Sequence, residues 1–223
     1  AQAVRAYLHY GGLTALPLCE MVLGVKYIVI LLLVFPALGV SAVERPNILI
    51  ILTDDQGTID ANCYGSTDLR TPNIDRLAAT GVLFTQAYAH TVCCPARAAL
   101  MTGRHPQRGG VHHWRQGDMN GPDDINMALE EVTLAEALKT AGYRTALYGK
   151  WHLGAHRDFG PKKQGFDEFF GIRDGFIDNY NHYFLHGTGF HDLYDGTTPV
   201  KAHGKYFPEM MILNISIHPD PQV

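Results

Sequence analysis

The chain has 223 residues, with 18 Lys and Arg against 22 Asp and Glu, and 46% of its residues are hydrophobic. This hydrophobic fraction is ordinary for a globular protein and excludes a chain that is disordered by composition. The net charge of −4, without a long run of either sign, argues against nucleic acid or an anionic membrane surface as a partner. The four cysteines are too few for a disulfide scaffold at this length.

The N-terminal region has the pattern of a secretory signal peptide. We assign no function to residues 1–20. After a short positive start comes the apolar run 27–35, followed by small residues at Gly39 and Ala42, the two alternative cleavage points, of which we favour Ala42. We therefore predict a signal peptide over 21–42 and a secreted or periplasmic protein without a stable membrane span. An uncleaved leader would instead anchor the chain in a membrane.

The first part of the mature chain alternates predicted strands and helices. Residues 47–52 (NILIIL) form a continuous apolar run that is typical of a buried central strand in a parallel sheet. Pro72 opens a predicted helix that runs to about Thr80, with Gly81 just past its end. Residues 82–84 (VLF) indicate a further strand.

The alternation continues in the second part of the chain. Residues 95–102 (PARAALMT) predict a short Ala-rich helix, and 133–136 (TLAE) form a capping box whose helix runs to Gly142. Residues 144–148 (RTALY) predict a strand, and from Gly149 onward we expect mostly loops. Strands that alternate with helices predict an α/β domain with a largely parallel central sheet.

Two carboxylates, Asp54 and Asp55, directly follow the first predicted strand. Ligands of open α/β sheets lie beyond the carboxyl ends of the strands. Adjacent carboxylates at such a position can both reach one hard cation, such as Ca²⁺ or Mg²⁺. The alternative is a solvated turn, which the sequence Asp-Asp-Gln-Gly also favours.

A second pattern, Cys-Cys-Pro-Ala-Arg beginning at Cys93, joins a nucleophile to the start of a helix. Pro95 at the first helical position predicts that Cys93 lies just before the helix N-terminus, where the dipole favours an anion. Helical side chains lean toward the N-terminus, so Arg97 should point back toward Cys93. As alternatives, Cys93 and Cys94 are buried small hydrophobes, or a disulfide links this pair to Cys63.

A third pattern, Gly-Lys-Trp-His, places Lys150 and His152 after the last predicted strand. In an extended segment these two side chains face the same side and can meet one substrate, whereas Trp151 points the other way, into packing. Lys supplies charge to an anionic group, and His moves or stabilises a proton near neutral pH. The alternative is a loop with a surface Lys and a structural His.

Together the three patterns, in this order and approximate spacing, resemble the type I sulfatases, the formylglycine-dependent arylsulfatase-like family. The resemblance rests on 53–57 (TDDQG), 93–97 (CCPAR), 102–104 (TGR) and 149–152 (GKWH), and it extends over about residues 46–207. It implies an alkaline-phosphatase-like α/β fold, of which this is the N-terminal part. It also implies hydrolysis of sulfate monoesters carried by a small molecule or a glycan.

The resemblance also implies a modification and a metal. In this family a formylglycine-generating enzyme oxidises the cysteine that matches Cys93 to formylglycine, and the hydrated aldehyde is the nucleophile. Asp54 and Asp55 would bind Ca²⁺, or Mg²⁺, together with the converted Cys93. Cys94 stands at the variable position of the motif. Ala96 replaces the usual Ser, so we expect less efficient conversion.

Three further residues gain catalytic roles from the resemblance. Arg97 would hold the formylglycine and balance its charge, and Lys150 would bridge the nucleophile and the sulfate. His152 would hydrogen-bond the formylglycine hydroxyl. The predicted catalytic set is thus Cys93, Arg97, Lys150 and His152.

Other groups of the family's site have no convincing counterpart before Val223: an Asp-Asn pair for the metal, a His that protonates the leaving group, and a second Lys. The pair at 178–179 comes too early, and we interpret its surroundings as a loop near the substrate entrance, with His182 as a candidate contact. Residues 208–223 do not resemble the family's continuation, and we interpret them as an atypical tail produced by a frameshift or truncated gene. We therefore expect a fold that is incomplete at its C-terminus and a poorly active chain.

Three other functions stay open. A phosphate or phosphonate monoester hydrolase of the same fold is one, although its members typically carry Ser or Thr in place of the motif cysteine. A non-catalytic binder of sulfated glycans would keep the site without turnover. A zinc protein would use His152 with His156, or His182 with His186, which have helix-like spacing but lie in Gly-rich segments.

Overall fold

The computed structural model describes residues 45–111, 126–185 and 189–217. The chain divides into two units, Ala1–Leu49 and Ile50–Val223, and all helices and strands discussed below lie in the second. The predicted signal peptide over 21–42 and the segment 1–20 lie outside the described residues. In the part of the chain that the structure describes, no helix is both long and apolar enough to cross a membrane.

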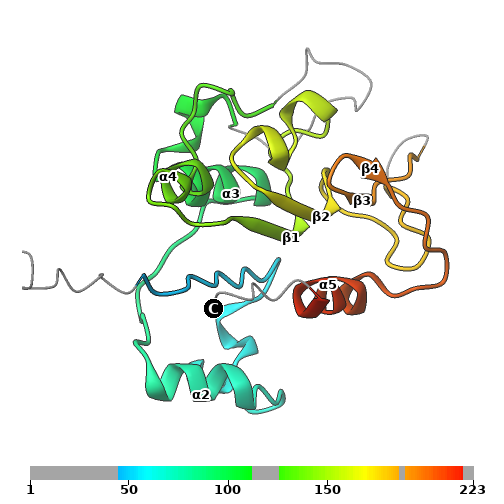
Figure 1. The fold of residues 1–223 in the computed structure, drawn as a ribbon. Coiled ribbons are helices and arrows are strands. Elements are labelled where there is room, and N and C mark those ends of the chain that lie inside the picture. The colour runs from blue at the N-terminus through cyan, green and yellow to red at the C-terminus, as the bar shows by residue number, and fades with distance from the viewer. Residues whose placement is uncertain (1–44, 112–125, 186–188, 218–223) are drawn as a thin grey trace, which may run out of the picture. The chain divides into compact units, whose positions relative to one another are not determined.

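The second unit contains a four-stranded sheet with the strands in sequence order (Figure 1). β1 (Ala146–Lys150) pairs in parallel with β2 (Glu168–Ile172). β3 (Tyr194–Asp195) and β4 (Thr198–Pro199) extend the sheet by antiparallel pairing. The sheet is therefore partly parallel, and the prediction of a largely parallel sheet is confirmed only for β1 and β2. β3 and β4 are joined by a tight turn, and only antiparallel neighbours can be joined in this way.

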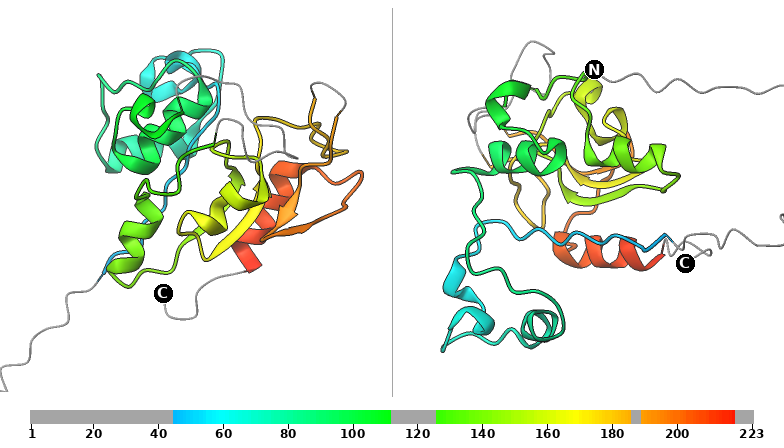
Figure 2. Two further views of the ribbon diagram at one scale, coloured as in Figure 1. Left: turned by 90° about the horizontal axis from the view of Figure 1, so that it is seen from above. Right: turned by 90° about the vertical axis from the view of Figure 1, so that its left-hand side faces the viewer.

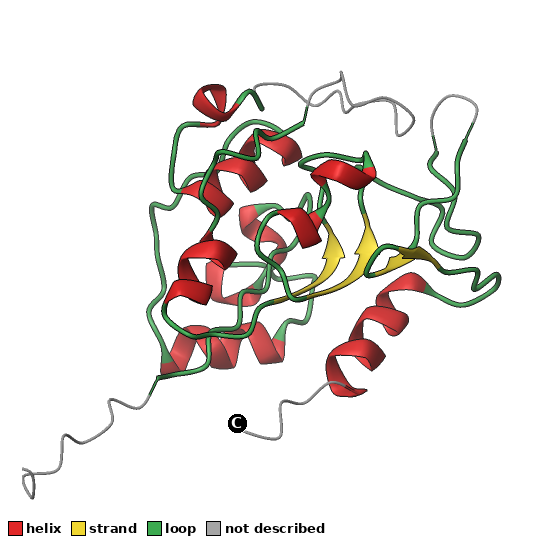
Figure 3. Cartoon of the chain, turned by 45° about the horizontal axis from the view of Figure 1, so that its top comes forward, coloured by secondary structure: helices red, strands yellow, loops and turns green. Residues whose placement is uncertain are grey.

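Helices cover both faces of the parallel strand pair (Figures 1 and 2). α3 packs with α4 on one side of β1 and β2, and α5 contacts the same two strands from the other side. Figure 3 shows the strands in yellow between red helices, so the unit is a mixed α/β arrangement. The α-helices are α2 (Pro72–Thr80), α3 (Cys93–Thr102), α4 (Leu134–Thr140) and α5 (Phe207–Ile217), and 3₁₀ turns lie at Thr58–Asp60, Asn62–Tyr64, Pro106–Gly109, Arg157–Phe159 and Pro161–Lys163.

Local helix signals predicted two of these helices well. α2 has the predicted bounds, with Gly81 at its C-terminal cap. The capping box of α4 is formed as predicted: Thr133 Oγ1 accepts the Glu136 N–H at 3.1 Å, and the Glu136 carboxylate accepts the Thr133 N–H at 2.7 Å. α4 ends at Thr140 and not at Gly142.

The two apolar segments 47–52 and 82–84 are not strands, contrary to prediction. Ile51 is 73% exposed and Val82 is 76% exposed. A strand exists only through hydrogen bonds to a neighbouring strand, and no described segment pairs with either of these. The apolar composition of these segments thus predicted a strand, a conformation that also requires a neighbouring strand.

The region from Gly149 onward is mostly irregular, as predicted, and it also holds β2, β3, β4 and α5. Gly171 lies inside β2 for a packing reason. Gly171 has a φ of +155°, and a Cβ atom there would stand 1.8 Å from the carbonyl oxygen of Gly149. The backbones of β1 and β2 therefore approach so closely at this point that only glycine fits.

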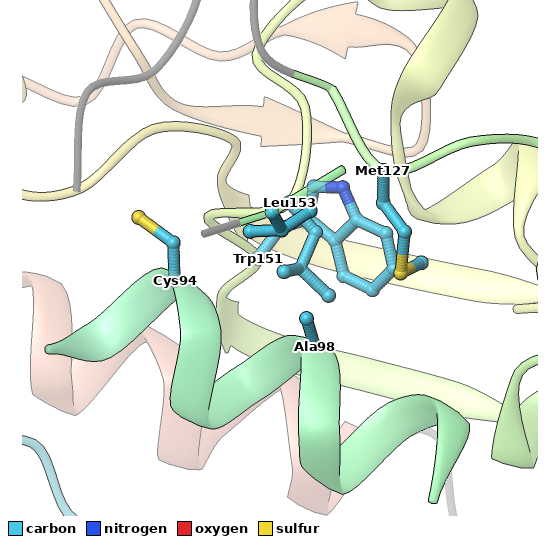
Figure 4. Packing of buried hydrophobic residues seen from close by; sticks show 6 residues of the cluster. Cys94, Ala98, Met127, Trp151 and Leu153 are labelled. Carbon is cyan, nitrogen blue, oxygen red and sulfur yellow. The ribbon is translucent and has the colours of Figure 1, made fainter. Parts of the chain in front are cut away.

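Two apolar clusters lie on opposite faces of the sheet. The cluster on the α3 face has Trp151 and Leu153 at its centre, and Figure 4 shows Ala98 of α3 directed at them. Side chains alternate along β1, so Leu147 joins this cluster and Tyr148 joins the one against α5. Trp151 is 1% exposed, which confirms the prediction that it points into packing.

The first cluster should dominate the stability of the unit. Leu153→Ala empties a fully buried position and should lower the free energy of unfolding by about 2–5 kcal/mol. Leu213→Ala on α5, at a position that is 59% exposed, is the matched control and should change it by less than about 0.5 kcal/mol. Urea unfolding followed by tryptophan fluorescence measures both. Equal losses in the two variants would contradict this assignment of the core.

Candidate active site

The N-terminus of α3 carries the cysteine pair. The helix begins at Cys93 with Val92 as its cap, so the prediction that Cys93 precedes the helix is wrong. Pro95 occupies the first turn, where backbone N–H groups have no acceptor within the helix, so a proline is tolerated there. The first intrahelical bond is donated by the Ala96 N–H to the Val92 carbonyl at 3.1 Å. Cys93 still lies at the positive end of the helix dipole.

The end of β1 brings the third sequence pattern against this helix. Lys150 is the last residue of β1 and not a residue beyond it. The backbone N–H groups of Trp151 and His152 continue the strand pairing by donating to the carbonyls of Ile172 and Arg173 at 2.9 and 3.0 Å. His152 has a φ of +58°, so the extended geometry assumed for the segment ends there.

His152 lies directly beside the cysteine pair. The Cys94 Sγ is 3.3 Å from His152 Nε2 and 3.5 Å from Nδ1, and both residues are buried. The Oδ1 of Asp174 lies 3.8 Å from Nε2, and Gly175 also lies against the ring. A Cβ atom at Gly175 would stand 2.7 Å from Nε2, so this glycine permits the position of the ring.

Asp54 connects the two cationic side chains of the site. Its Oδ2 lies 2.6 Å from Lys150 Nζ and 3.1 Å from Arg97 Nη2, while Arg97 Nη1 donates to the Lys150 carbonyl at 2.6 Å. Burial raises the pKa of the Asp54 carboxyl, but Lys150 and Arg97 outweigh burial and hold that pKa below its usual value. Asp54 is therefore ionised at neutral pH.

The structure separates the two neighbouring carboxylates. Among the described residues we find no hydrogen bond or ion pair for Asp55, and its φ of +58° turns the chain at that point. Of the predicted site residues, Arg97 and Lys150 thus meet Asp54, whereas Cys93 meets His152.

The thiol of Cys93 is strongly acidified. Hydrogen bonds from Cys94 and His152 outweigh the effect of burial and, with the charge of Lys150, lower the pKa of Cys93 to about 3. Burial lowers the pKa of His152, and this effect outweighs the hydrogen bond with Cys93, which raises the pKa. The site therefore pairs a thiolate with a neutral imidazole at neutral pH.

The sequence reasoning missed the residues that support His152. Asp192 is fully buried and accepts the backbone N–H groups of Arg173 and Asp174 at 3.0 and 2.9 Å. Burial raises the pKa of this carboxyl to about 6 despite those bonds. The only local signal was the Arg-Asp-Gly run after a buried strand, and the partner lies far along the chain.

The remaining histidine and Asp-Asn candidates have structural roles. Asp178 accepts the N–H groups of Tyr180 and Asn181, which makes it the first residue of a turn. His182 is fully buried, and its Nε2 lies 3.1 Å from the Lys205 carbonyl oxygen. His186 lies outside the described residues. The cysteines that the structure describes are free thiols, so the disulfide alternative fails for them.

Two carboxylates of the described residues carry donors that suit a hard cation. Asp54 and Asp55 provide carboxylate oxygens, the donors that Ca²⁺ prefers, but Ca²⁺ takes about six to eight of them. The ligating side chains that the structure does gather, with all ligand atoms within 4.8 Å of one another, are Cys93, Cys94 and His152.

Residues 46–211 match the family model described as Sulfatase, and the chain belongs to this family. Human steryl-sulfatase is 45% identical over 140 residues, which cover 59% of this chain and 24% of the relative. N-acetylgalactosamine-6-sulfatase of Canis lupus familiaris is 46% identical over 149 residues, which cover 63% of this chain and 28% of the relative. The chain thus spans about a quarter of the length of these curated relatives.

A solved structure shows a similar fold. The crystal structure of Ps i-CgsB in complex with k-i-k-neocarrahexaose matches with a TM-score of 0.63 and 28% sequence identity. The match covers 75% of this chain and 41% of that one. The resemblance drawn from the three sequence patterns is therefore confirmed at the level of the family.

The acidified thiol predicts an unusual pH profile for alkylation. Because Cys93 is a thiolate at any pH well above 3, its rate with iodoacetamide should stay flat between about pH 5 and pH 8. A thiol with an ordinary pKa of about 8.5 reacts about ten times faster for each pH unit over this range. Mass spectrometry of the Cys93 peptide measures the rate, and a full ordinary slope in the unsubstituted chain would refute the acidification.

Gly175 should be required for the position of His152. Gly175→Ala places a methyl group against the ring and should shift the imidazole NMR signals of His152 and return a pH slope to Cys93 alkylation. Gly160→Ala is the control, because a Cβ atom there would have its nearest contact at an ordinary 3.6 Å. Unchanged imidazole signals in Gly175→Ala would contradict the close approach.

Proposed function

We propose that the protein to which this sequence belongs hydrolyses sulfate monoesters, with Cys93 converted to formylglycine as its nucleophile. The observation that carries this proposal is the convergence of Cys93, Lys150 and His152 at the N-terminus of α3, with Arg97 on the same helix. Membership of the sulfatase family supports the reaction. An alkaline-phosphatase-like fold for the whole protein is part of the same proposal.

Formylglycine would supply a hydrated aldehyde whose hydroxyl attacks the sulfur of the ester. The guanidinium of Arg97 is placed to interact with an oxygen atom on residue 93. It lies one helical turn from Cys93 on the same face of α3, and its Nε is buried without a hydrogen-bond partner among the described residues. That N–H would donate to an oxygen on residue 93 and stabilise negative charge there.

Lys150 and His152 would handle charge and protons. Lys150 acts electrostatically on both Asp54 and Cys93, so its ammonium group lies where it would contact the nucleophile and a sulfate oxygen together. His152 is neutral and hydrogen-bonds to residue 93, which allows its ring to hold the nucleophile's proton. Asp174 would orient the ring.

Asp54 and Asp55 would contribute to a Ca²⁺ site, or a Mg²⁺ site, together with the converted residue 93. The ion would act as a Lewis acid that holds sulfate oxygens. Support comes from the ionised state of Asp54, because a hard cation requires an anionic oxygen donor. The further oxygens would come from groups beyond these residues.

We infer a sulfate ester of a small molecule or a glycan as the substrate class. The curated relatives are named for steryl and N-acetylgalactosamine-6-sulfate esters, and Ps i-CgsB is seen with k-i-k-neocarrahexaose. Export to a secreted or periplasmic location, with conversion of Cys93 by a formylglycine-generating enzyme on the way, completes the proposal.

The proposal is tested by conversion and turnover. The chain is co-expressed with a formylglycine-generating enzyme, and the mass of the Cys93 peptide should change from cysteine to formylglycine. The converted chain should cleave 4-nitrophenyl sulfate slowly, because the described carboxylates make only part of a metal site, and faster than 4-nitrophenyl phosphate.

Two matched variants control this test. Cys93→Ala should abolish turnover, and Cys63→Ala, which removes a thiol elsewhere, should leave it unchanged. Preference for the phosphate ester would favour the phosphatase alternative. If the chain with an unconverted Cys93 binds sulfated glycans tightly without turnover, the alternative of a non-catalytic glycan-binding protein is favoured.

A further inference from the structure

Three soft ligands meet at one point in the unconverted chain. The Sγ atoms of Cys93 and Cys94 and a ring nitrogen of His152 all lie within 4.8 Å of one another. Two of them come from the first turn of α3, and the third comes from the segment after β1. The group is distinct from the carboxylates assigned to calcium, because neither Asp54 nor Asp55 belongs to it.

We propose that the chain in which Cys93 is still a thiol binds a soft divalent cation, with Zn²⁺ as the physiological metal, through Cys93, Cys94 and His152. Thiolate sulfur and imidazole nitrogen are the donors that Zn²⁺ and Cd²⁺ prefer, in tetrahedral geometry. Three protein ligands leave one coordination position for water. This inference goes beyond the proposed function, because it concerns the protein before conversion.

The ligands are held by the core and not by a mobile surface. Cys94 is 0% exposed and belongs to the same apolar cluster as Trp151, next to the ligand His152. His152 is 3% exposed, and its backbone N–H is fixed by the carbonyl of Arg173. A site whose ligands are already oriented loses little entropy when the metal binds.

A carboxylate also lies near the histidine ring. Asp174 Oδ1 lies 3.8 Å from His152 Nε2, and the backbone of Asp174 is itself held by Asp192. A ligating histidine usually donates its second N–H to such a carboxylate, which fixes the ring and raises its basicity. With the metal on Nδ1, the Nε2–H of His152 would face Asp174.

Metal binding by the thiolates and conversion of Cys93 to formylglycine compete for the same residue. Both cysteines bind the divalent cation as thiolates, so the metal–dithiolate unit is neutral. Asp54 neutralises one of the two positive charges of nearby Arg97 and Lys150. Conversion replaces the Cys93 sulfur with an aldehyde and removes one of the three ligands. Metal loading and conversion are therefore mutually exclusive states of residue 93.

The test is a cadmium titration of the full reduced chain, expressed without the converting enzyme. Cadmium–thiolate bonds absorb in the ultraviolet, and the signal should saturate at one Cd²⁺ per chain with two thiolates, with Zn²⁺ displacing the cadmium. Cys93→Ser and Cys94→Ser should each weaken binding by at least about tenfold. The matched controls Cys19→Ser and Cys63→Ser should bind as the unsubstituted chain does.

Several results would overturn the proposal. These are unchanged binding in both Cys93→Ser and Cys94→Ser, loss of binding in Cys63→Ser, or equal binding by the formylglycine-containing chain. Because Cys94 is fully buried, circular dichroism checks that the Cys94→Ser variant still folds. The half-buried Cys93 and the converted chain provide two further measurements of binding that do not depend on a substitution in the core. Cadmium binding and ester cleavage are measured separately, so failure of one leaves the other standing.

Discussion

The parallel pairing of β1 with β2 is the constraint on which the site depends. Gly149 and Gly171 let the two backbones approach closely, and the pairing continues past the strand end through Trp151 and His152. Trp151 then enters the core beneath α3, and the residues on either side of it reach the helix N-terminus. The placement of a lysine and a histidine beside Cys93 is thus a consequence of strand pairing and of burying one indole.

Electrostatics explains why these groups coexist in a partly buried place. Two cations, Arg97 and Lys150, share one carboxylate oxygen of Asp54, which offsets one of the two positive charges. An isolated buried cation would be costly. The histidine is neutral through burial, so it adds a hydrogen-bonding group without adding charge.

Sequence reasoning succeeded where the signal was local or chemical. The capping box at Thr133 needs only neighbouring residues, and the meeting of Cys93 with His152 was implied by the resemblance to the sulfatases. It failed where the outcome depends on a distant partner. The run 47–52 has every local feature of a strand and no described neighbour to pair with. Asp192 supports His152 only because the chain returns to it, which no local pattern encodes.

The chemical identity of residue 93 decides which kind of ligand the site prefers. With a thiol, the nearest donors are two sulfurs and an imidazole, and the site is soft. With an oxygen-bearing aldehyde hydrate, one sulfur is lost and the new oxygens face Arg97 and Lys150, close to the carboxylate of Asp54. Those surroundings suit an oxyanion and a hard cation. One covalent change would therefore switch the metal preference of the site without moving the backbone, because every supporting residue is already fixed by the sheet and the core.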